Sequence, residues 1–96
     1  MTRMDTVHNY YERLVFNEIK EHYAERVEED NDIMADMACV ALNRISPRYI
    51  RYDIDMSFYM STDEHLDVEK RVKKAVKKAY KKVQKFKKKE RQNDLS

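Results

Sequence analysis

Apolar residues recur at three- and four-residue intervals in three stretches of the chain, which is the spacing of one helical face. The first stretch runs from Asp5 to about Tyr23 and carries Val7, Tyr10, Tyr11, Leu14, Val15 and Ile19. It predicts an amphipathic helix whose N-terminus is capped by Asp5 or Thr6. Residues 25–32 are acidic and almost devoid of apolar side chains, so we expect a loop or a frayed helix end there.

The second stretch, roughly Asp32 to Ile45, is apolar around nearly its whole circumference. It predicts a helix that is capped by Asn31 or Asp32 and ends before Pro47, whose ring disfavours helical geometry at the preceding residue. A helix that is apolar on all sides requires burial on several sides. One flanking helix and one short ribbon give little cover in so small a domain, so we expect a homodimer built around this helix.

Residues 49–60 are rich in β-branched and aromatic side chains. They predict a short β-strand or hairpin between the second and third helices, with a possible bend at 53–55. A single longer strand that pairs across a dimer fits the same pattern.

The third apolar stretch predicts a long, Lys-rich helix. Ser61-Thr-Asp-Glu64 matches a capping box, and an apolar stripe follows from Leu66 to about Lys89. Repulsion among the lysines weakens its last turns, so we expect a disordered tail at 90–96. A chain of 96 residues builds one core, which predicts a single, mainly α domain over residues 1–89.

Glycine is absent from the chain, and Cys39 is the single cysteine. Gly-rich phosphate loops, Rossmann turns and Asn-Gly hairpins are therefore excluded, because each needs the backbone freedom of glycine. The apolar neighbours of Cys39 predict a small buried side chain in a reducing environment. No apolar run reaches the roughly 18 residues that span a bilayer, so we expect a cytoplasmic protein with no membrane span.

The charges are segregated along the chain. Residues 1–69 hold 7 Lys/Arg against 16 Asp/Glu, whereas residues 70–91 hold 13 Lys/Arg against Glu90 alone. The basic segment is expected either to lie near the acidic part of its own chain or of a partner subunit, or to contact nucleic acid, an anionic membrane or a phosphorylated ligand. With only Tyr80 and Phe86 as aromatic residues, any DNA binding is expected to be salt-sensitive and indifferent to sequence.

Side chains suited to phosphates and bases gather where the second helix ends, namely Asn43, Arg44, Arg48, Tyr49, Arg51 and Tyr52. Guanidinium groups bind phosphate in a bidentate manner and dock on the edge of guanine, while phenol rings stack on bases. These groups suit a small ligand with two phosphates and two bases. In the structural alternative, Asn43 and Arg44 hold the helix C-terminus, Tyr49 packs, and the other arginines pair with acids.

The sequence offers little for catalysis. The histidines His8, His22 and His65 are widely separated and no cysteines accompany them, so no zinc site is expected. The carboxylates lie at predicted helix surfaces or in the acidic run, where solvation is the default. Because no activated nucleophile or metal can be named, we expect no enzymatic activity.

Asp36 together with Ala41-Leu-Asn-Arg-Ile-Ser-Pro-Arg-Tyr49 resembles the signature of the late competence development ComFB family, approximately Asp, a few apolar residues, then Ala-Leu-Asn-Arg-Leu-Pro-Pro-x-Tyr. The likeness covers roughly residues 6–85. Ser46 departs from it, because a first proline is common there, and so does the Lys-rich end. Many members carry cysteines that look like zinc ligands just before the second helix. Here Val27–Asn31 occupies that place, which argues against a structural metal.

The resemblance implies a small, mainly helical homodimer without known catalysis, from a family with members that look like receptors for cyclic dinucleotides such as c-di-GMP or c-di-AMP. The motif positions that it implies for binding are Asp36, Asn43, Arg44, Pro47 and Tyr49, to which chemistry adds Arg48, Arg51 and Tyr52. We therefore expect a signalling module that binds a cyclic dinucleotide and passes the bound state to an unknown effector protein affecting competence, motility or surface behaviour. The alternative is a structural adaptor that contacts protein or DNA through residues 70–91 without a small ligand.

Overall fold

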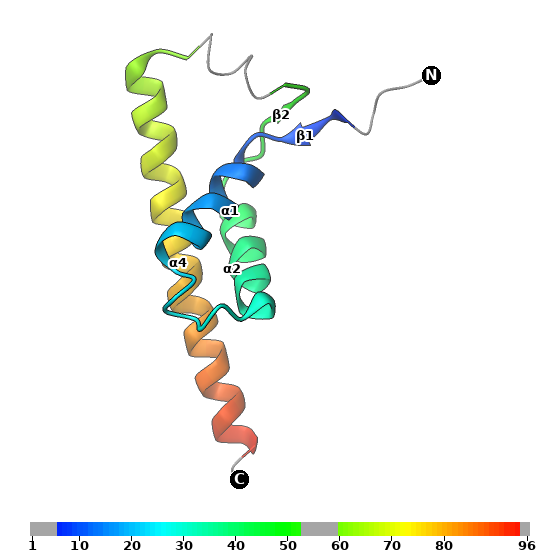
Figure 1. Ribbon diagram of the computed structural model, residues 1–96, viewed down its shortest axis with the longest axis vertical. Coiled ribbons are helices and arrows are strands. Elements are labelled where there is room, and N and C mark those ends of the chain that lie inside the picture. The colour runs from blue at the N-terminus through cyan, green and yellow to red at the C-terminus, as the bar shows by residue number, and fades with distance from the viewer. Residues whose placement is uncertain (1–5, 53–59, 95–96) are drawn as a thin grey trace.

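The computed structural model describes residues 6–52 and 60–94, with side chains as far as Lys88. Along the chain it contains β1 (His8–Asn9), α1 (Tyr11–His22), α2 (Asn31–Arg44), β2 (Tyr49–Ile50) and α4 (Thr62–Asp94) (Figure 1). At 1.5 Å per residue, the 33 residues of α4 span roughly 50 Å. They account for the longest dimension of the molecule, 53 Å. For the described residues, the prediction of a mainly α fold with three helices, the third long and Lys-rich, is confirmed.

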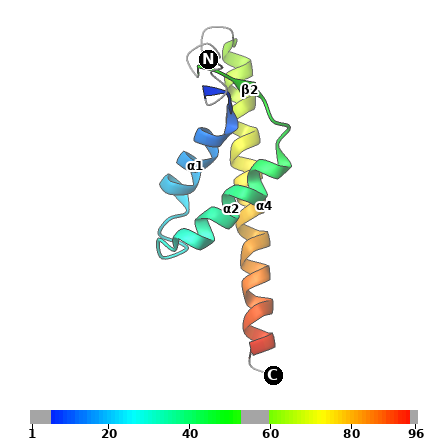
Figure 2. The same cartoon turned by 90° about the vertical axis from the view of Figure 1, so that its right-hand side faces the viewer.

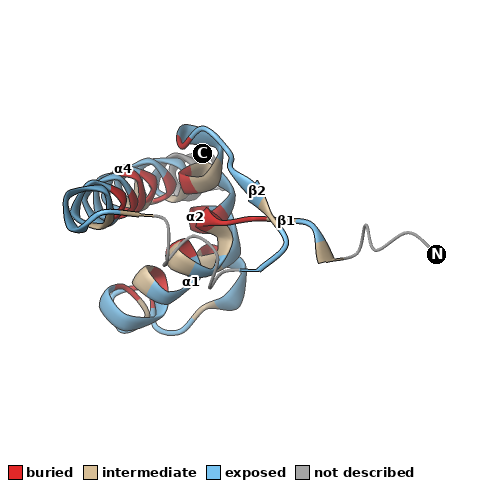
Figure 3. Ribbon diagram, turned by 90° about the horizontal axis from the view of Figure 1, so that it is seen from above, coloured by how far each residue is buried: buried red, intermediate tan, exposed pale blue. Residues whose placement is uncertain are grey.

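The helices α1, α2 and α4 enclose one core. Figures 1 and 2 show α1 and α2 packed against the same part of α4, with α2 crossing α4 obliquely. Each helix supplies one of the most deeply buried large side chains, Val15 from α1, Met37 from α2 and Val76 from α4. Buried positions follow the inward faces of all three helices (Figure 3). Removal of this apolar area from water is the main force that holds the helices together.

A short strand does lie between the second and third helices of the chain, as the sequence predicts, but its partner comes from ahead of the first helix. β2 pairs antiparallel with β1, with His8 opposite Ile50 and Asn9 opposite Tyr49. The predicted hairpin bend at 53–55 lies outside the described residues. The sheet therefore ties the N-terminal segment to the connection that follows α2.

The predicted start of the first helix at Asp5 or Thr6 is wrong for the described residues, since α1 begins at Tyr11. The backbone N–H of Tyr11 donates to the side-chain Oδ1 of Asn9 at 3.2 Å, and the N–H of Tyr10 donates to the carbonyl of Arg48 at 2.7 Å. These bonds favour an extended backbone before the helix, which periodicity alone does not reveal. Asp5 lies outside the described residues.

The other helix ends follow the expected chemistry, with a shift at the start of α2 and another at the end of α4. Oδ1 of Asp30 accepts from the N–H groups of Asp32 and Ile33 at 2.9 and 3.1 Å, so Asp30 is the cap of α2 rather than Asn31 or Asp32. At the start of α4, the hydroxyl of Ser61 accepts from the N–H of Glu64 at 3.2 Å, which is the expected cap. The helix α4 continues to residue 94, past the boundary predicted at residue 89.

The helix α2 is covered on one side only within a single chain. Ile33, Met37, Ala38 and Ala41 are buried against α1 and α4. Cys39 is exposed, so the prediction of a buried cysteine is wrong for the isolated chain. At 100° per residue Cys39 points away from the side that carries Met37 and Ala41. Within 6–52 and 60–94, no helix combines the length and apolar character needed to cross a membrane.

Candidate functional site

The last residue of α2, Arg44, is exposed and borders a hollow that it shares with α4. A groove of about 480 Å³ separates this end of α2 from α4, and we call it the basic groove; its walls are Arg44, Ile45, Ser46, Arg71, Lys74, Ala75 and Lys78. Its volume is within the roughly 300–1,000 Å³ of small-ligand sites. Four of its seven residues are cationic. The groove therefore joins the predicted motif to the Lys-rich helix.

Helical geometry explains why these cations come together. Lys74 and Lys78 are four residues apart, and Arg71 precedes Lys78 by seven, so all three lie along one flank of α4. This flank borders Ala75, which belongs to the buried stripe that contacts α2. Burial of the stripe consequently sets the cationic flank next to the C-terminus of α2.

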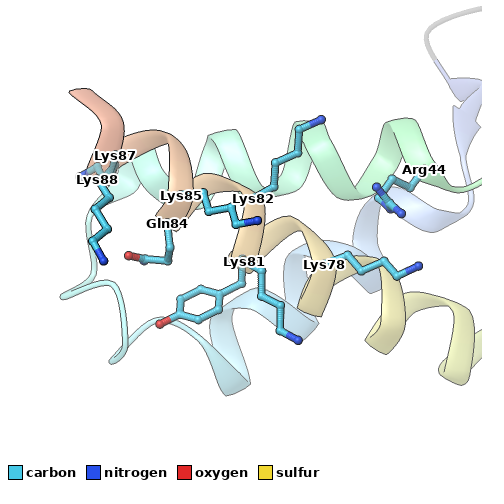
Figure 4. A pocket seen from close by; sticks show the side chains of 9 residues that line it. Arg44, Lys78, Lys81, Lys82, Gln84, Lys85, Lys87 and Lys88 are labelled. Atoms are coloured by element: carbon cyan, nitrogen blue, oxygen red, sulfur yellow. The ribbon is translucent and has the colours of Figure 1, made fainter. Parts of the chain in front are cut away.

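A second hollow, of about 940 Å³, continues the positive surface along α4; its walls are Arg44, Lys78, Tyr80, Lys81, Lys82, Gln84, Lys85, Lys87 and Lys88. Figure 4 shows Arg44 and Lys78 at one end of this hollow and Lys87 and Lys88 at the other. Arg44 and Lys78 line both hollows, so they mark the place where the positive surface meets the family-like motif.

Most of this charge has no acidic partner among the described side chains. Among the described side chains lining the two hollows, Lys87 alone lies within ion-pair distance of a carboxylate, with its Nζ 3.8 Å from Oδ2 of Asp30. At this contact the basic segment does lie near the acidic part of its own chain, as one of the two expectations has it. Arg44, Lys74 and Lys78 have no such contact with a described carboxylate, and clustered cations of this kind raise the local concentration of anions.

The guanidinium group of Arg71 makes one long hydrogen bond to α1. Its Nη1 donates to the hydroxyl of Tyr11 at 3.5 Å, and Tyr11 is buried. The sequence prediction did not single out Arg71, Lys74 or Lys78 from the rest of the basic stripe. The sequence does show that these three residues lie on the flank next to the apolar stripe. That position becomes informative only when one knows where α2 crosses α4.

The predicted residues after the helix are exposed near the start of β2. Tyr49 is 67% exposed, so the alternative in which it packs is wrong. Arg51 lies over the ring of Tyr52, 5.2 Å from guanidinium carbon to ring centroid, and its Nη2 donates to the Tyr52 hydroxyl at 3.3 Å. Arg51 therefore pairs with an aromatic ring, a contact of about 0.5–1 kcal/mol at an exposed site. Arg48 is exposed too, while its backbone is held by β1.

The remaining motif residues point elsewhere. Asp36 and Asn43 are exposed and seven residues apart, so they share the outward side of α2 rather than the basic groove. Pro47 is exposed in the turn between α2 and β2. Of the eight predicted site residues, Arg44 alone lines the basic groove as described.

The family membership of the chain follows from a comparison of its sequence with known families. The family model of the late competence development protein ComFB matches residues 8–87, most of the chain. The chain belongs to the ComFB family. The matched range contains β1, both flanks of the basic groove and all eight predicted site residues. Neither the curated proteins nor the solved structures contain a match.

Proposed function

We propose that this ComFB-family protein is a non-enzymatic receptor for a cyclic dinucleotide, c-di-GMP or c-di-AMP, which binds in the basic groove. The observation that supports the proposal is the meeting of Arg44 with Arg71, Lys74 and Lys78, none of which has an ion pair with a described carboxylate. A cyclic dinucleotide presents two phosphates on a compact ring. Two helices that converge with several cations offer both phosphates charge-assisted hydrogen bonds at the same time.

The turn next to the groove supplies groups for the bases. Ile45 and Ser46 line the groove, and the chain from there leads directly to the exposed ring of Tyr49 and the Arg51–Tyr52 pair. Phenol rings and guanidinium planes stack on nucleobases with little dependence on base identity. We assign the phosphates to the groove and the bases to this turn.

We further propose that two copies associate through the outward side of α2. Ala35 and Cys39 are exposed there, Leu42 is half-buried, and the neighbouring Phe16 of α1 is 45% exposed. A hollow of about 190 Å³ with mainly apolar walls lies beside them, between Phe16 and Ala35. A second copy that covers this face buries the apolar positions that one chain leaves in water.

Sedimentation analysis tests the dimer. Ala35→Arg places a charge in the proposed interface and is expected to give a folded monomer. The matched control, Asn17→Arg, adds the same charge to an exposed residue of α1 that borders α4 and not the apolar hollow beside Ala35. A monomeric wild type, or equal behaviour of the two variants, contradicts the association.

Calorimetric titration of the wild type with c-di-GMP and with c-di-AMP tests the receptor. We expect one of them to bind, and we expect Arg44→Ala to weaken binding about tenfold or more, because a hydrogen bond to a charged group contributes about 1.5–3 kcal/mol. Absence of binding by both ligands at high micromolar concentration overturns the proposal.

A second candidate function is nucleic-acid binding by α4. The helix extends beyond α1 and α2 (Figure 1), with Lys81, Lys85 and Lys88 exposed. Such binding depends on the number of lysines and not on Arg44. The test is the binding of the protein to DNA at increasing salt concentrations. Binding that falls steeply with salt and is unchanged in Arg44→Ala supports an adaptor instead of a receptor.

A further inference from the structure

Asn9 is a buried polar residue in the segment that leads into α1. It is 7% exposed, and the other buried residues of the described chain are apolar. Its side-chain Oδ1 accepts two hydrogen bonds, from the N–H of Tyr11 at 3.2 Å and from the N–H of Arg48 at 3.0 Å. One amide oxygen thus joins the start of α1 to a turn that lies 39 residues further along the chain.

The backbone of Arg48 is held on both sides by the same segment. Its N–H donates to Asn9, and its carbonyl accepts from the N–H of Tyr10 at 2.7 Å. The next residue, Tyr49, is paired with Asn9 in the β1–β2 sheet. The turn after Pro47 is therefore anchored to β1, and Asn9 provides its side-chain acceptor.

We infer that Asn9 is a positioning residue for the ligand-binding turn, an inference that rests on the proposed function. The turn connects Arg44 and Ser46, which line the basic groove, with the exposed ring of Tyr49. With Arg48 fixed by Asn9, phosphate-binding and base-stacking groups keep one relative position before the ligand arrives. Without that bond the turn must be ordered during binding, and the ordering entropy lowers the affinity.

Three variants separate this role from a general loss of stability. Asn9→Leu keeps the branched shape of the side chain but has no acceptor, whereas Asn9→Asp keeps an oxygen acceptor at the same place. Ser61→Ala is the matched control, because it removes a helix cap with one backbone hydrogen bond at the N-terminus of α4, ten residues before Arg71 and outside the walls of the basic groove. Circular dichroism at the working temperature establishes that each variant is folded.

The first readout needs no ligand. Amide hydrogen exchange of Arg48, followed by NMR in each full-length variant, reports its hydrogen bond directly. We expect exchange at Arg48 to be about tenfold faster or more in Asn9→Leu, and to stay slow in Asn9→Asp and Ser61→Ala. Unchanged exchange in Asn9→Leu overturns the inference.

The second readout is calorimetric affinity for c-di-GMP and c-di-AMP. We expect the dissociation constant to rise about tenfold in Asn9→Leu and by less than about twofold in Ser61→Ala. Equal losses in the two variants, or faster exchange at Arg48 with unchanged affinity, overturn the positioning role. If the wild type binds neither ligand, the proposed function fails, while the exchange of Arg48 still decides whether Asn9 fixes the turn.

Discussion

The loop between α1 and α2 contains two consecutive residues in left-handed backbone geometry, Glu28 with φ 55° and Glu29 with φ 54°. The chain has no glycine to occupy such positions. For a residue with a Cβ atom, this geometry costs about 1–2 kcal/mol, because Cβ approaches the following carbonyl oxygen. Glu28→Gly removes that cost. Glycine also adds about 0.4–1 kcal/mol of unfolded-state entropy to be lost on folding, so the midpoints of the two ranges give a net gain in stability of about 0.8 kcal/mol.

The loop supports this substitution because its contacts are made by the backbone. The N–H of Glu29 donates to the carbonyl of Ala24 at 2.8 Å, and the N–H of Glu28 donates to the carbonyl of Glu25 at 3.1 Å. Both side chains are exposed, so their loss removes no buried contact. For a domain of this size, 1 kcal/mol corresponds to a change in melting temperature of roughly 4–8 °C.

Thermal and urea unfolding of Glu28→Gly therefore give a higher melting temperature and a higher urea midpoint than wild type. Glu25→Gly is the matched control. Glu25 is exposed in the same loop, but it is not one of the described residues that have a positive φ angle. It is expected to lose about 0.5–1 kcal/mol. Equal destabilisation by the two substitutions refutes the assignment of backbone strain to residue 28.

Three further predictions concern the core, the cap of α2 and alkaline pH. Met37 is fully buried, so Met37→Ala is expected to cost about 2–5 kcal/mol in urea unfolding; a cost below about 1 kcal/mol places the core elsewhere. Asp30→Ala removes the acceptor of two N–H groups and is expected to cost about 1 kcal/mol. Asp30→Asn keeps the acceptor and loses only the charge, with its half-exposed ion pair to Lys87 and its interaction with the helix dipole. It is expected to cost less than Asp30→Ala, and an equal cost for both variants contradicts the cap. Burial raises the pKa of Tyr23, with Arg26 opposing the shift. The unfolded chain therefore loses this proton first, and stability falls as pH rises above about 10. Tyr23→Phe lessens that fall, and parallel pH profiles for wild type and variant disprove it.

The helices were predictable because their apolar spacing is local. Val72, Val76 and Val83 recur on one side of α4, and that side is buried. The strand β1 was not predictable in this way, because Val7 and Tyr10 also fit helical spacing. The bond that decides for an extended segment joins Asn9 to Arg48, 39 residues away, and no local pattern contains it. The left-handed loop was equally hidden, since no glycine marks it.

The residues of the candidate site were predictable from the sequence, but their arrangement was not. Arg44 could be chosen from the motif, and the lysines of α4 could be recognised as a basic stripe. Their meeting in one groove depends on the place at which α2 crosses α4, which is set by packing across the core. The exposure of Cys39 also depends on packing across the core, because α1 and α4 cover one side of α2 and leave the other side free. Periodicity shows that a helix is apolar all round but not which side stays open.

The central claim is that the basic groove binds a cyclic dinucleotide, and two adjacent lysines provide its most direct test. Lys78 lines the groove, whereas Lys77 is exposed and lines neither hollow of the described surface. Calorimetric titration with c-di-GMP and c-di-AMP is expected to show binding by wild type, about tenfold weaker binding by Lys78→Ala, and a change of less than about twofold in Lys77→Ala. Equal losses in the two variants, or no binding by wild type, contradict the claim.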